Sequence, residues 1–310
     1  MKDNLKILMA MDGSDQSFDA VRYISGIFPS HKTRVVLFCV NTVVPEAFLD
    51  LSREAVFRSR VAEISAWAVQ MKKNINDFMD RARAILIDSG FSSGNVTIKV
   101  QVKQQGIARD ILTESRDRYD ALVVGRKGVS KLKDVVMGSV ANKLLGKMSH
   151  APIIVVGGKP DPGKVLIGFD GSKGAMKAVD CAGSLANSSL CIFDLCHVIR
   201  PLEIQMGVKS LFNPNVEDEW IESNIKEIKP IMDEAADHLM RYGVPDNHIS
   251  KTILKRESSR AEAMVRKAKN DNYGSIVVGR RGISVVEEFF LGRVSTKVIQ
   301  MANKMAVWVV

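Results

Sequence analysis

The sequence of 310 residues contains one pattern twice, and this repeat limits its possible folds more than any other feature. LKILMAMDGS at 5–14 returns as GKVLIGFDGS at 163–172. Four more matches follow in the same order: RVVLFCV with CIFDLCHV, VTIKVQV with ISKTILK, RYDALVVG with NYGSIVVG, and PIIVV with AVWVV. Each half therefore contains five candidate strands, and we expect two similar domains.

Strands and helices are predicted to alternate within each half. Short β-branched runs such as ALVVG are separated by segments of helical spacing, as in Phe18, Val21, Ile24 and Ile27. This alternation predicts parallel strands joined by right-handed crossovers, with helices on both faces of the sheet. We expect two doubly wound α/β domains, residues 1–157 and 164–310, joined by a turn-rich linker at 158–163.

The second helical segment is long in both halves. In the first half, no Pro or Gly occurs from Glu46 through Ser89. In the second half, the corresponding pattern contains Pro230. Because proline lacks the amide hydrogen that a helix needs, we expect the second of these helices to be kinked or split near Pro230.

The composition excludes several classes of protein. Hydrophobic residues make up 46% and charged residues 25%, which is typical of a water-soluble globular protein. The net charge is +9, and residues 1–159 hold 24 Lys and Arg against 16 Asp and Glu, whereas residues 160–310 hold 20 against 19. Aromatic residues make up only 6%, and no basic run interleaves with them. Nucleic acid is therefore not the expected partner, and a small anionic ligand explains the charge as well.

The cysteines and the N-terminal residues bear on the compartment. The four cysteines form no C-x-x-C pair and lie mostly in apolar runs, as expected for free thiols in a reducing compartment. The first apolar run ends at Asp12, which is too early for a signal peptide, and no stretch approaches the length of a membrane span. We expect a cytoplasmic protein with no membrane partner.

Two glycine-containing segments follow the fourth predicted strand of each half. GRKGVSKLKDVVMGS at 125–139 and GRRGISVVEEFFLGR at 279–293 share one spacing of glycines. In an open parallel sheet, ligands bind beyond the carboxyl ends of the strands, and the amino end of a helix attracts phosphate. A phosphate site is therefore expected where Gly138 and Ser139 begin a helix. The alternative is that these glycines only shape turns.

A carboxylate ends the first strand of each half, Asp12 in the first and Asp170 in the second. It repels phosphate, but it accepts hydrogen bonds from a ribose hydroxyl or from the adenine amine. Val40 and Val124 are expected to line an apolar slot for the base. An alternative role for Asp12 is to cap the helix that starts near Ser14.

Cations lie between the paired glycines. Arg126 and Lys127 in the first half, and Arg280 and Arg281 in the second, either reach the phosphates or remain solvated. The sequence contains no P-loop and no G-x-G-x-x-G after a first strand, and its histidines show no metal-ligand spacing. No nucleophile, base and acid occur in a recognisable order, so we expect no catalytic residue and no protein-held metal.

Taken together, these motifs resemble the universal stress protein family in its tandem, two-domain form. The family signature, Gly-x₂-Gly-x₉-Gly followed by Ser or Thr, is met by Gly125, Gly128, Gly138 and Ser139. The resemblance implies a Rossmann-like fold with a five-stranded parallel sheet of order 3-2-1-4-5 in each domain. It also implies that the last strands pair within the chain, so that the two domains pack as a pseudo-dimer.

The resemblance further implies a bound adenine nucleotide, namely ATP, with Mg²⁺ as a companion ion and with AMP or ADP left open as alternatives. The residues that it assigns to the first site, together with the neighbouring Gly13, Arg126 and Lys127, are Asp12, Val40, Val124, Gly125, Gly128, Gly138, Ser139 and Val140. The corresponding residues of the second site are Asp170, Val198, Val278, Gly279, Gly282, Gly292, Arg293 and Val294.

The two expected sites differ at one signature position, where Arg293 replaces the hydroxyl of Ser139. Ser295 is not expected to substitute, because two helical steps turn a side chain by roughly 200°. Arg293 either clamps a phosphate through its planar fork or fills the pocket and excludes the nucleotide. We expect an impaired or altered second site, with Arg293→Ser raising the nucleotide stoichiometry toward two per chain.

The function expected from these features is ATP binding in a regulatory or stress-response protein with little or no turnover. Weak ATP hydrolysis and a higher homo-oligomer are left open. One alternative is an enzyme of the adenine nucleotide α-hydrolase type, because DGSDQS at 12–17 faintly resembles the S-G-G-x-D-S loop of that class. Another is a protein that works through interactions alone, with both crevices empty.

Overall fold

The computed structural model describes residues 4–42, 58–128, 136–206, 214–282 and 291–310. The start of the expected long helix at Glu46, and the middle of each glycine segment at 129–135 and 283–290, lie outside these residues. The described elements of the first half are β1 Leu5–Ala10, α1 Asp15–Ile27, β2 Thr33–Asn41, α3 Arg58–Asp88, β3 Val96–Val102, α4 Ile107–Glu114, β4 Ala121–Gly125, α5 Ser139–Lys147 and β5 Ile153–Val156.

The second half repeats this order of elements after the connection at 157–163. Its elements are β6 Lys164–Gly168, α6 Lys173–Leu185, β7 Ile192–Val198, α7 Leu202–Met206, α8 Pro214–Arg241, β8 Ile249–Leu254, α9 Arg260–Asn270, β9 Ser275–Val278, α10 Arg293–Met301 and β10 Ala306–Val309. The ten strands coincide with the ten runs that the repeat predicts. A helical segment separates each pair of successive strands within a half.

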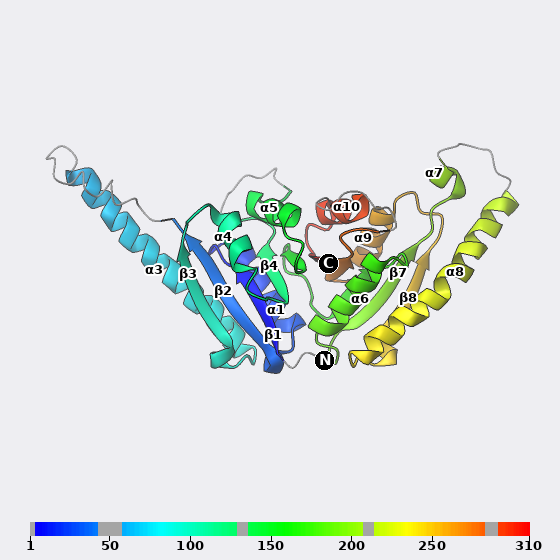
Figure 1. Ribbon diagram of the computed structural model, residues 1–310, viewed down its shortest axis with the longest axis horizontal. Coiled ribbons are helices and arrows are strands. Elements are labelled where there is room, and N and C mark those ends of the chain that lie inside the picture. Colours follow the sequence, from blue (N-terminus) through cyan, green and yellow to red (C-terminus); the bar gives the residue numbers. More distant parts are fainter. Residues whose placement is uncertain (1–3, 43–57, 129–135, 207–213, 283–290) are drawn as a thin grey trace.

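All ten strands belong to one sheet of order β3-β2-β1-β4-β5-β10-β9-β6-β7-β8. Each half has the expected order 3-2-1-4-5 with parallel neighbours, and the halves join where β5 and β10 pair antiparallel, with Val156 opposite Ala306. The predicted fold class and the pairing of the last strands are therefore confirmed. Figure 1 shows the halves side by side across this junction, with α3 and α8 at the two ends.

Two hydrophobic layers cover the sheet. On one face, α1, α3, α6 and α8 pack on alternate strand residues such as Ile7 and Ile167. On the other face, α4, α5, α9 and α10 pack on the intervening residues such as Leu8 and Leu166. Both layers continue across the junction between the halves. This is the burial that near-continuous apolar parallel strands require.

Buried polar contacts also cross the junction. The indole N–H of Trp308 on β10 donates to the hydroxyl of Tyr23 on α1 at 2.8 Å, and that hydroxyl lies 2.6 Å from the Ser275 hydroxyl on β9. All three residues are buried. Since unsatisfied buried polar groups are costly, these bonds fix how the two halves meet.

The expected split at Pro230 does not occur, because α8 runs from Pro214 to Arg241 as one helix, while the alternative expectation of a kink stays a prediction. Proline removes one backbone hydrogen bond, but the buried Ile228 and Met232 on either side of it hold the helix on the sheet. Packing on a hydrophobic face therefore outweighs the local cost. Across the described helices, none combines the length and apolar character that crossing a membrane requires.

The junction makes a prediction about the isolated first half. β5 is fully buried in the whole chain, and a chain of residues 1–158 would expose it as an apolar sheet edge. We expect this truncated chain to form a homodimer in which β5 pairs with its own copy. Sedimentation velocity on both chains measures this, with the 310-residue chain as control, and a strictly monomeric truncated chain would contradict it.

Candidate functional site

The carboxyl ends of three neighbouring strands bring the first-domain residues together. β1 lies between β2 and β4, and its Ala10 is opposite both Phe38 and Val124. Asp12 lies just beyond β1, and Val40 lies two residues after Phe38 on β2. The expected nucleoside end of the site is therefore formed at one edge of the sheet.

The aspartate at the end of the first strand has a defined structural role. In the first half, Asp12 Oδ1 accepts hydrogen bonds from the Ser14 amide at 3.0 Å and from the Ser14 hydroxyl at 2.6 Å. The cap of α1 is Ser14, whose hydroxyl accepts from the Ser17 amide. Asp12 therefore orients the capping residue rather than capping the helix itself. Asp170 accepts from the amide of Ser172 in the same way.

The second glycine of each segment allows the loop to approach this aspartate. A Cβ atom on Gly128 would lie 2.5 Å from Oδ2 of Asp12, and a Cβ atom on Gly282 would lie 2.5 Å from Oδ2 of Asp170. Both distances are too short for non-bonded atoms, so a larger residue at either position would displace the aspartate carboxylate. The glycines shape the loop, as the alternative interpretation expected. They also bring the part of each site that is expected to bind the nucleoside close to the part that is expected to bind phosphate.

The third glycine closes the loop and starts a helix. The Gly138 amide donates to the Arg126 carbonyl at 2.8 Å, and the Gly292 amide donates to the Arg280 carbonyl at 2.9 Å. Gly138 and Gly292 are the capping residues of α5 and α10, and neither has a side chain to satisfy the first-turn amides. Uncapped amides at a helix start, with the dipole behind them, are suited to an anion.

The structure has a cavity of about 1070 Å³ in the second half. All eight residues expected for the second site line it: Asp170, Val198, Val278, Gly279, Gly282, Gly292, Arg293 and Val294. The exposed Arg293 lies at its wall, and the cavity remains open beside it. Both expected roles of Arg293, clamping a phosphate and excluding the nucleotide, place its side chain at this wall, and both stay predictions. Ser295 also lines the cavity, contrary to the expectation that it faces elsewhere, but its hydroxyl donates to the Gly279 carbonyl at 2.7 Å.

The expectation that Arg126 reaches the phosphates is contradicted by its contacts. Its side chain is buried and crosses the junction, where Nη1 donates to the Ile299 carbonyl at 2.6 Å and Nη2 donates to the Ala302 carbonyl at 3.0 Å. These carbonyls lie at the carboxyl end of α10, where a cation is favourable. Burial lowers the pKa of Arg126 to about 10, so it stays charged at neutral pH.

Arg280 makes the reciprocal contact, and it does not point into the second site either. Its Nη1 donates to the Leu145 carbonyl at 2.8 Å, near the carboxyl end of α5. The adjacent Arg281 lines the cavity. In the first half, the Lys127 amide donates to Oε1 of Gln16 at 2.7 Å, which anchors the loop backbone. Of each pair of cations, the first therefore belongs to the domain junction and the second to the loop.

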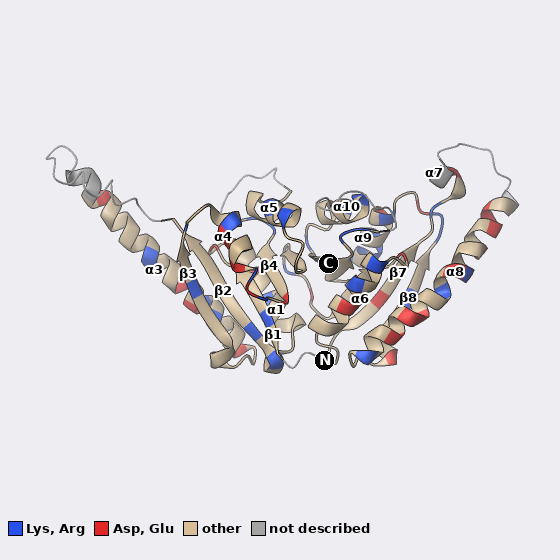
Figure 2. Ribbon diagram, in the orientation of Figure 1, with Lys and Arg blue, Asp and Glu red and all other residues tan. Residues whose placement is uncertain are grey.

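Sequence reasoning missed four residues that line the cavity: His197, Arg200, Trp220 and Arg260. His197 Nδ1 donates to the Phe169 carbonyl at 2.8 Å, and burial lowers the pKa of His197, so its Nε2 is an unprotonated acceptor at neutral pH. The sequence offered one clue to Arg200, because this residue follows Val198, which was expected at the site, by two positions. The near-zero net charge of the second half gave no sign of these cations, because acidic residues along α8 offset them in the count (Figure 2).

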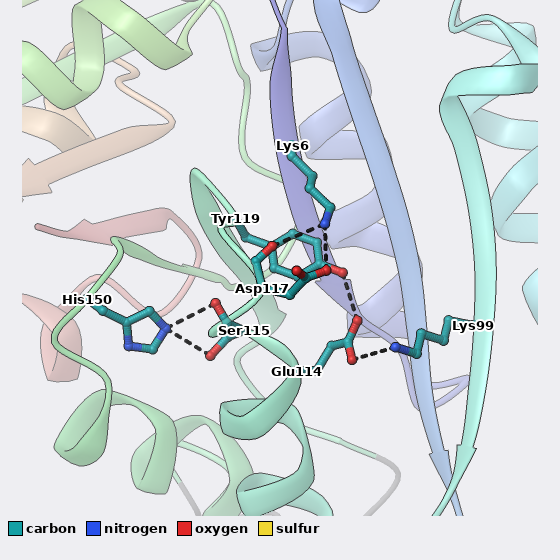
Figure 3. A network of polar contacts seen from close by, with 7 residues as sticks. All are labelled: Lys6, Lys99, Glu114, Ser115, Asp117, Tyr119 and His150. Atoms are coloured by element: carbon teal, nitrogen blue, oxygen red, sulfur yellow. Dashed lines mark hydrogen bonds and ion pairs between the residues drawn. The ribbon is translucent and has the colours of Figure 1, made fainter.

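A separate polar network occupies the opposite edge of the first half (Figure 3). Glu114 at the end of α4 accepts from Lys99 on β3 at 2.7 Å and from the hydroxyl of Tyr119 at 2.8 Å. Lys6 at the start of β1 donates to Asp117 at 2.9 Å. Lys6, Asp117 and Tyr119 lie at the amino ends of β1 and β4, whereas the site lies at the carboxyl ends. The network therefore ties the end of α4 to β3 and to the segment before β4.

The described residues contain no group of three His, Cys, Asp or Glu side chains placed to hold a metal ion. The site nevertheless offers carboxylates singly, as Asp12 and Asp170 show. A Mg²⁺ ion entering with a nucleotide would depend mainly on the phosphates for its ligands.

Comparisons with known proteins agree with this geometry. The model of the Universal stress protein family matches residues 4–157 and again residues 162–310. The chain belongs to the universal stress protein family, in its tandem form. It is 24% identical over 302 residues to a universal stress protein of Mycolicibacterium smegmatis, covering 96% of this chain and 94% of that protein.

A shorter relative matches one half of the chain. The universal stress protein YxiE of Bacillus subtilis is 32% identical over 145 residues, which is 45% of this chain and 93% of that protein. Among solved structures, a universal stress protein from Archaeoglobus fulgidus covers 100% of this chain and 98% of its own, with a TM-score of 0.56 and 16% identity. This likeness shows the shared fold.

The reciprocal arginines lead to a stability prediction. Arg126→Met removes the buried charge-assisted donors to the Ile299 and Ala302 carbonyls, so we expect the free energy of unfolding to fall by about 2 kcal/mol or more. Urea denaturation measures this. Arg22→Met, which removes an exposed arginine paired with Asp19, is the matched control and is expected to cost less than about 1 kcal/mol. Equal losses in the two variants would show that Arg126 does not secure the junction.

Proposed function

We propose that this protein binds an adenine nucleotide, ATP in the first instance, and acts as a regulatory or stress-response protein with little or no turnover. The observation that carries the proposal is the convergence of all eight expected second-site residues on one cavity. The cavity volume of about 1070 Å³ is ample for a nucleotide, since small-molecule sites are commonly about 300–1,000 Å³.

The chemistry of the lining suits the parts of a nucleotide. Val198 and Val278 offer an apolar surface for a base, and Asp170 offers a carboxylate oxygen for ribose hydroxyls. The amino end of α10, with Arg293 and Arg281 beside it, offers amides and cations for phosphates. The order of these groups, apolar slot, carboxylate and helix start, is the order of base, sugar and phosphate.

A binding role rather than an enzymatic one is proposed because the lining supplies no evident catalytic base. His197 is the candidate by residue type, but it is held against the Phe169 carbonyl at the nucleoside end, away from the helix start that is assigned to phosphate. Incubation with ATP and analysis of the products tests this point. Rapid release of pyrophosphate in the presence of a second substrate would favour the α-hydrolase alternative.

The first-domain site is tested by removing its helix start. We expect Gly138→Val combined with Ser139→Ala to lower the affinity for ATP at that site at least about tenfold, because the added side chain crowds the Arg126 carbonyl and the hydroxyl is lost. Isothermal titration of the wild type and the double variant measures this. Ser25→Ala, on the opposite end of α1, is the control, and equal affinity in all three proteins would eliminate the proposed site.

We propose the opposite effect for Arg293 from the one expected from the sequence: Arg293 supports nucleotide binding in the second half rather than impairing it. Because the cavity is open with Arg293 at its wall, we expect the arginine to clamp phosphate and Arg293→Ser to weaken ATP binding in the second half about tenfold. Titration resolves the affinity and the stoichiometry together. A rise in stoichiometry toward two per chain would restore the view that Arg293 blocks the site.

Mass spectrometry of small molecules released by denaturing the purified protein separates nucleotide binding from a purely interactive role. A retained adenine nucleotide supports the proposal. Failure of ATP, ADP and AMP to bind in titration would favour the alternative in which both crevices are empty.

A further inference from the structure

The two crevices differ in charge at the nucleoside end as well as at the helix start. Arg200 follows Val198, the last residue of β7, by two positions, and the equivalent residue of the first half is Thr42. Arg260 is the first residue of α9, whereas the first residue of α4 is Ile107. The second half therefore carries two arginines where the first half carries a neutral polar and an apolar side chain, and the shared fold requires neither cation.

These two arginines lie close together and near the aspartate that is assigned to ribose. Both line the cavity with Asp170. Burial lowers the pKa of Arg260, and the nearby positive charge of Arg200 lowers it further, while Asp170 has the opposite effect. Arg260 also stands at the positive amino end of α9. Two cations and a helix start that face one cavity make this part of it attractive to an anion.

The guanidinium of Arg200 retains hydrogen-bonding capacity. Its Nη2 donates to the Ile204 carbonyl at 3.3 Å, and its Nε is buried without a partner among the residues that the structure describes. Its own carbonyl accepts from the indole N–H of Trp220 at 3.3 Å, and both residues line the cavity. A buried donor without a partner is costly, and an anionic oxygen in the cavity would satisfy it.

We propose that the cavity of the second half binds a nucleoside bisphosphate, a nucleotide that carries a phosphate on its ribose 2′ or 3′ oxygen in addition to its 5′-phosphate. Arg200 and Arg260 hold the ribose phosphate and offset its repulsion by Asp170, and Arg293 and the start of α10 hold the 5′-phosphate. Dinucleotide sites give the precedent for an arginine at a ribose phosphate: a carboxylate reads the ribose 2′-hydroxyl of NAD, whereas an arginine accommodates the 2′-phosphate of NADP. The inference rests on the proposed nucleotide site and deepens it.

Tryptophan fluorescence can report on this cavity alone. The chain has three tryptophans. Trp308 is fully buried at the junction, Trp220 lines the cavity, and Trp67 on α3 is 50% exposed in the first half. In a Trp67→Phe protein, a change of fluorescence on adding ligand therefore reports on Trp220.

The experiment titrates this protein with AMP, adenosine 2′,5′-bisphosphate and adenosine 3′,5′-bisphosphate. We expect at least one bisphosphate to bind about tenfold or more tightly than AMP, because two arginines contact the added phosphate. Combined Arg200→Gln and Arg260→Gln should bring the ratio of the two affinities close to one. Arg22→Gln, an exposed arginine of the first half, is the control and should leave the ratio unchanged.

Each outcome bears on a different claim. A wild-type ratio near one, or a high ratio that survives in the double variant, overturns the inference while AMP binding keeps the proposed function. A double variant that loses AMP and bisphosphate equally places the arginines at the common part of the ligand and also overturns it. If no adenine nucleotide binds, the proposed function itself fails. Thr42→Arg with Ile107→Arg provides a gain-of-function test, since it should create the preference in the first half.

Discussion

The antiparallel pairing of β5 with β10 is the constraint on which the rest of the structure depends. Each is the last strand of its half, and each is buried on both faces. Left alone, either strand would be an open apolar edge, which soluble proteins avoid. The pairing turns two five-stranded sheets into one ten-stranded sheet and lets both hydrophobic layers continue across it. The tandem chain thereby covers both edges within one molecule.

This junction also determines which arginines remain available for ligands. Because β5 and β10 lie together, the carboxyl ends of α10 and α5 come within reach of Arg126 and Arg280. Each arginine is the residue that follows the first glycine of its segment, and the loop carbonyl of the same residue accepts from the third glycine. One residue thus connects the ligand loop of its own half to the last helix of the other half. The two crevices are parts of one connected framework.

The two crevices share a framework and differ in what lines it. The aspartate at the end of the first strand, the glycine beneath it and the uncapped helix start recur with nearly equal geometry. At the same time, arginines replace Thr42, Ile107 and Ser139. In both halves, the glycine loop approaches the aspartate closely, and this steric restriction limits which residues can stand there. Side chains at the rim of the crevice are under no such restriction and can differ between the halves. The two halves of one chain therefore present crevices of different charge.

Much of this architecture follows from the sequence alone. The internal repeat, the ten apolar runs and the helical spacing between them determine two doubly wound domains, because these patterns depend on period and are local. The spacing of Gly125, Gly128 and Gly138 also locates the loop, and the structure supplies the steric reason, the closeness of Asp12 to Gly128. The local cost of proline in a helix predicts a split at Pro230, but packing of the neighbouring residues keeps α8 continuous.

The tertiary structure decided what long side chains do. Nothing in the sequence distinguishes Arg126, which is buried in the junction, from Lys127, which stays with the loop, because their partners lie on another domain or on another helix. The same holds for Arg200 and Arg260, which are 60 residues apart and meet in one cavity only after β7 and α9 pack on the same sheet. Spacing along the chain fixes the backbone, whereas the partner of a flexible cation is set by contacts between elements far apart in sequence.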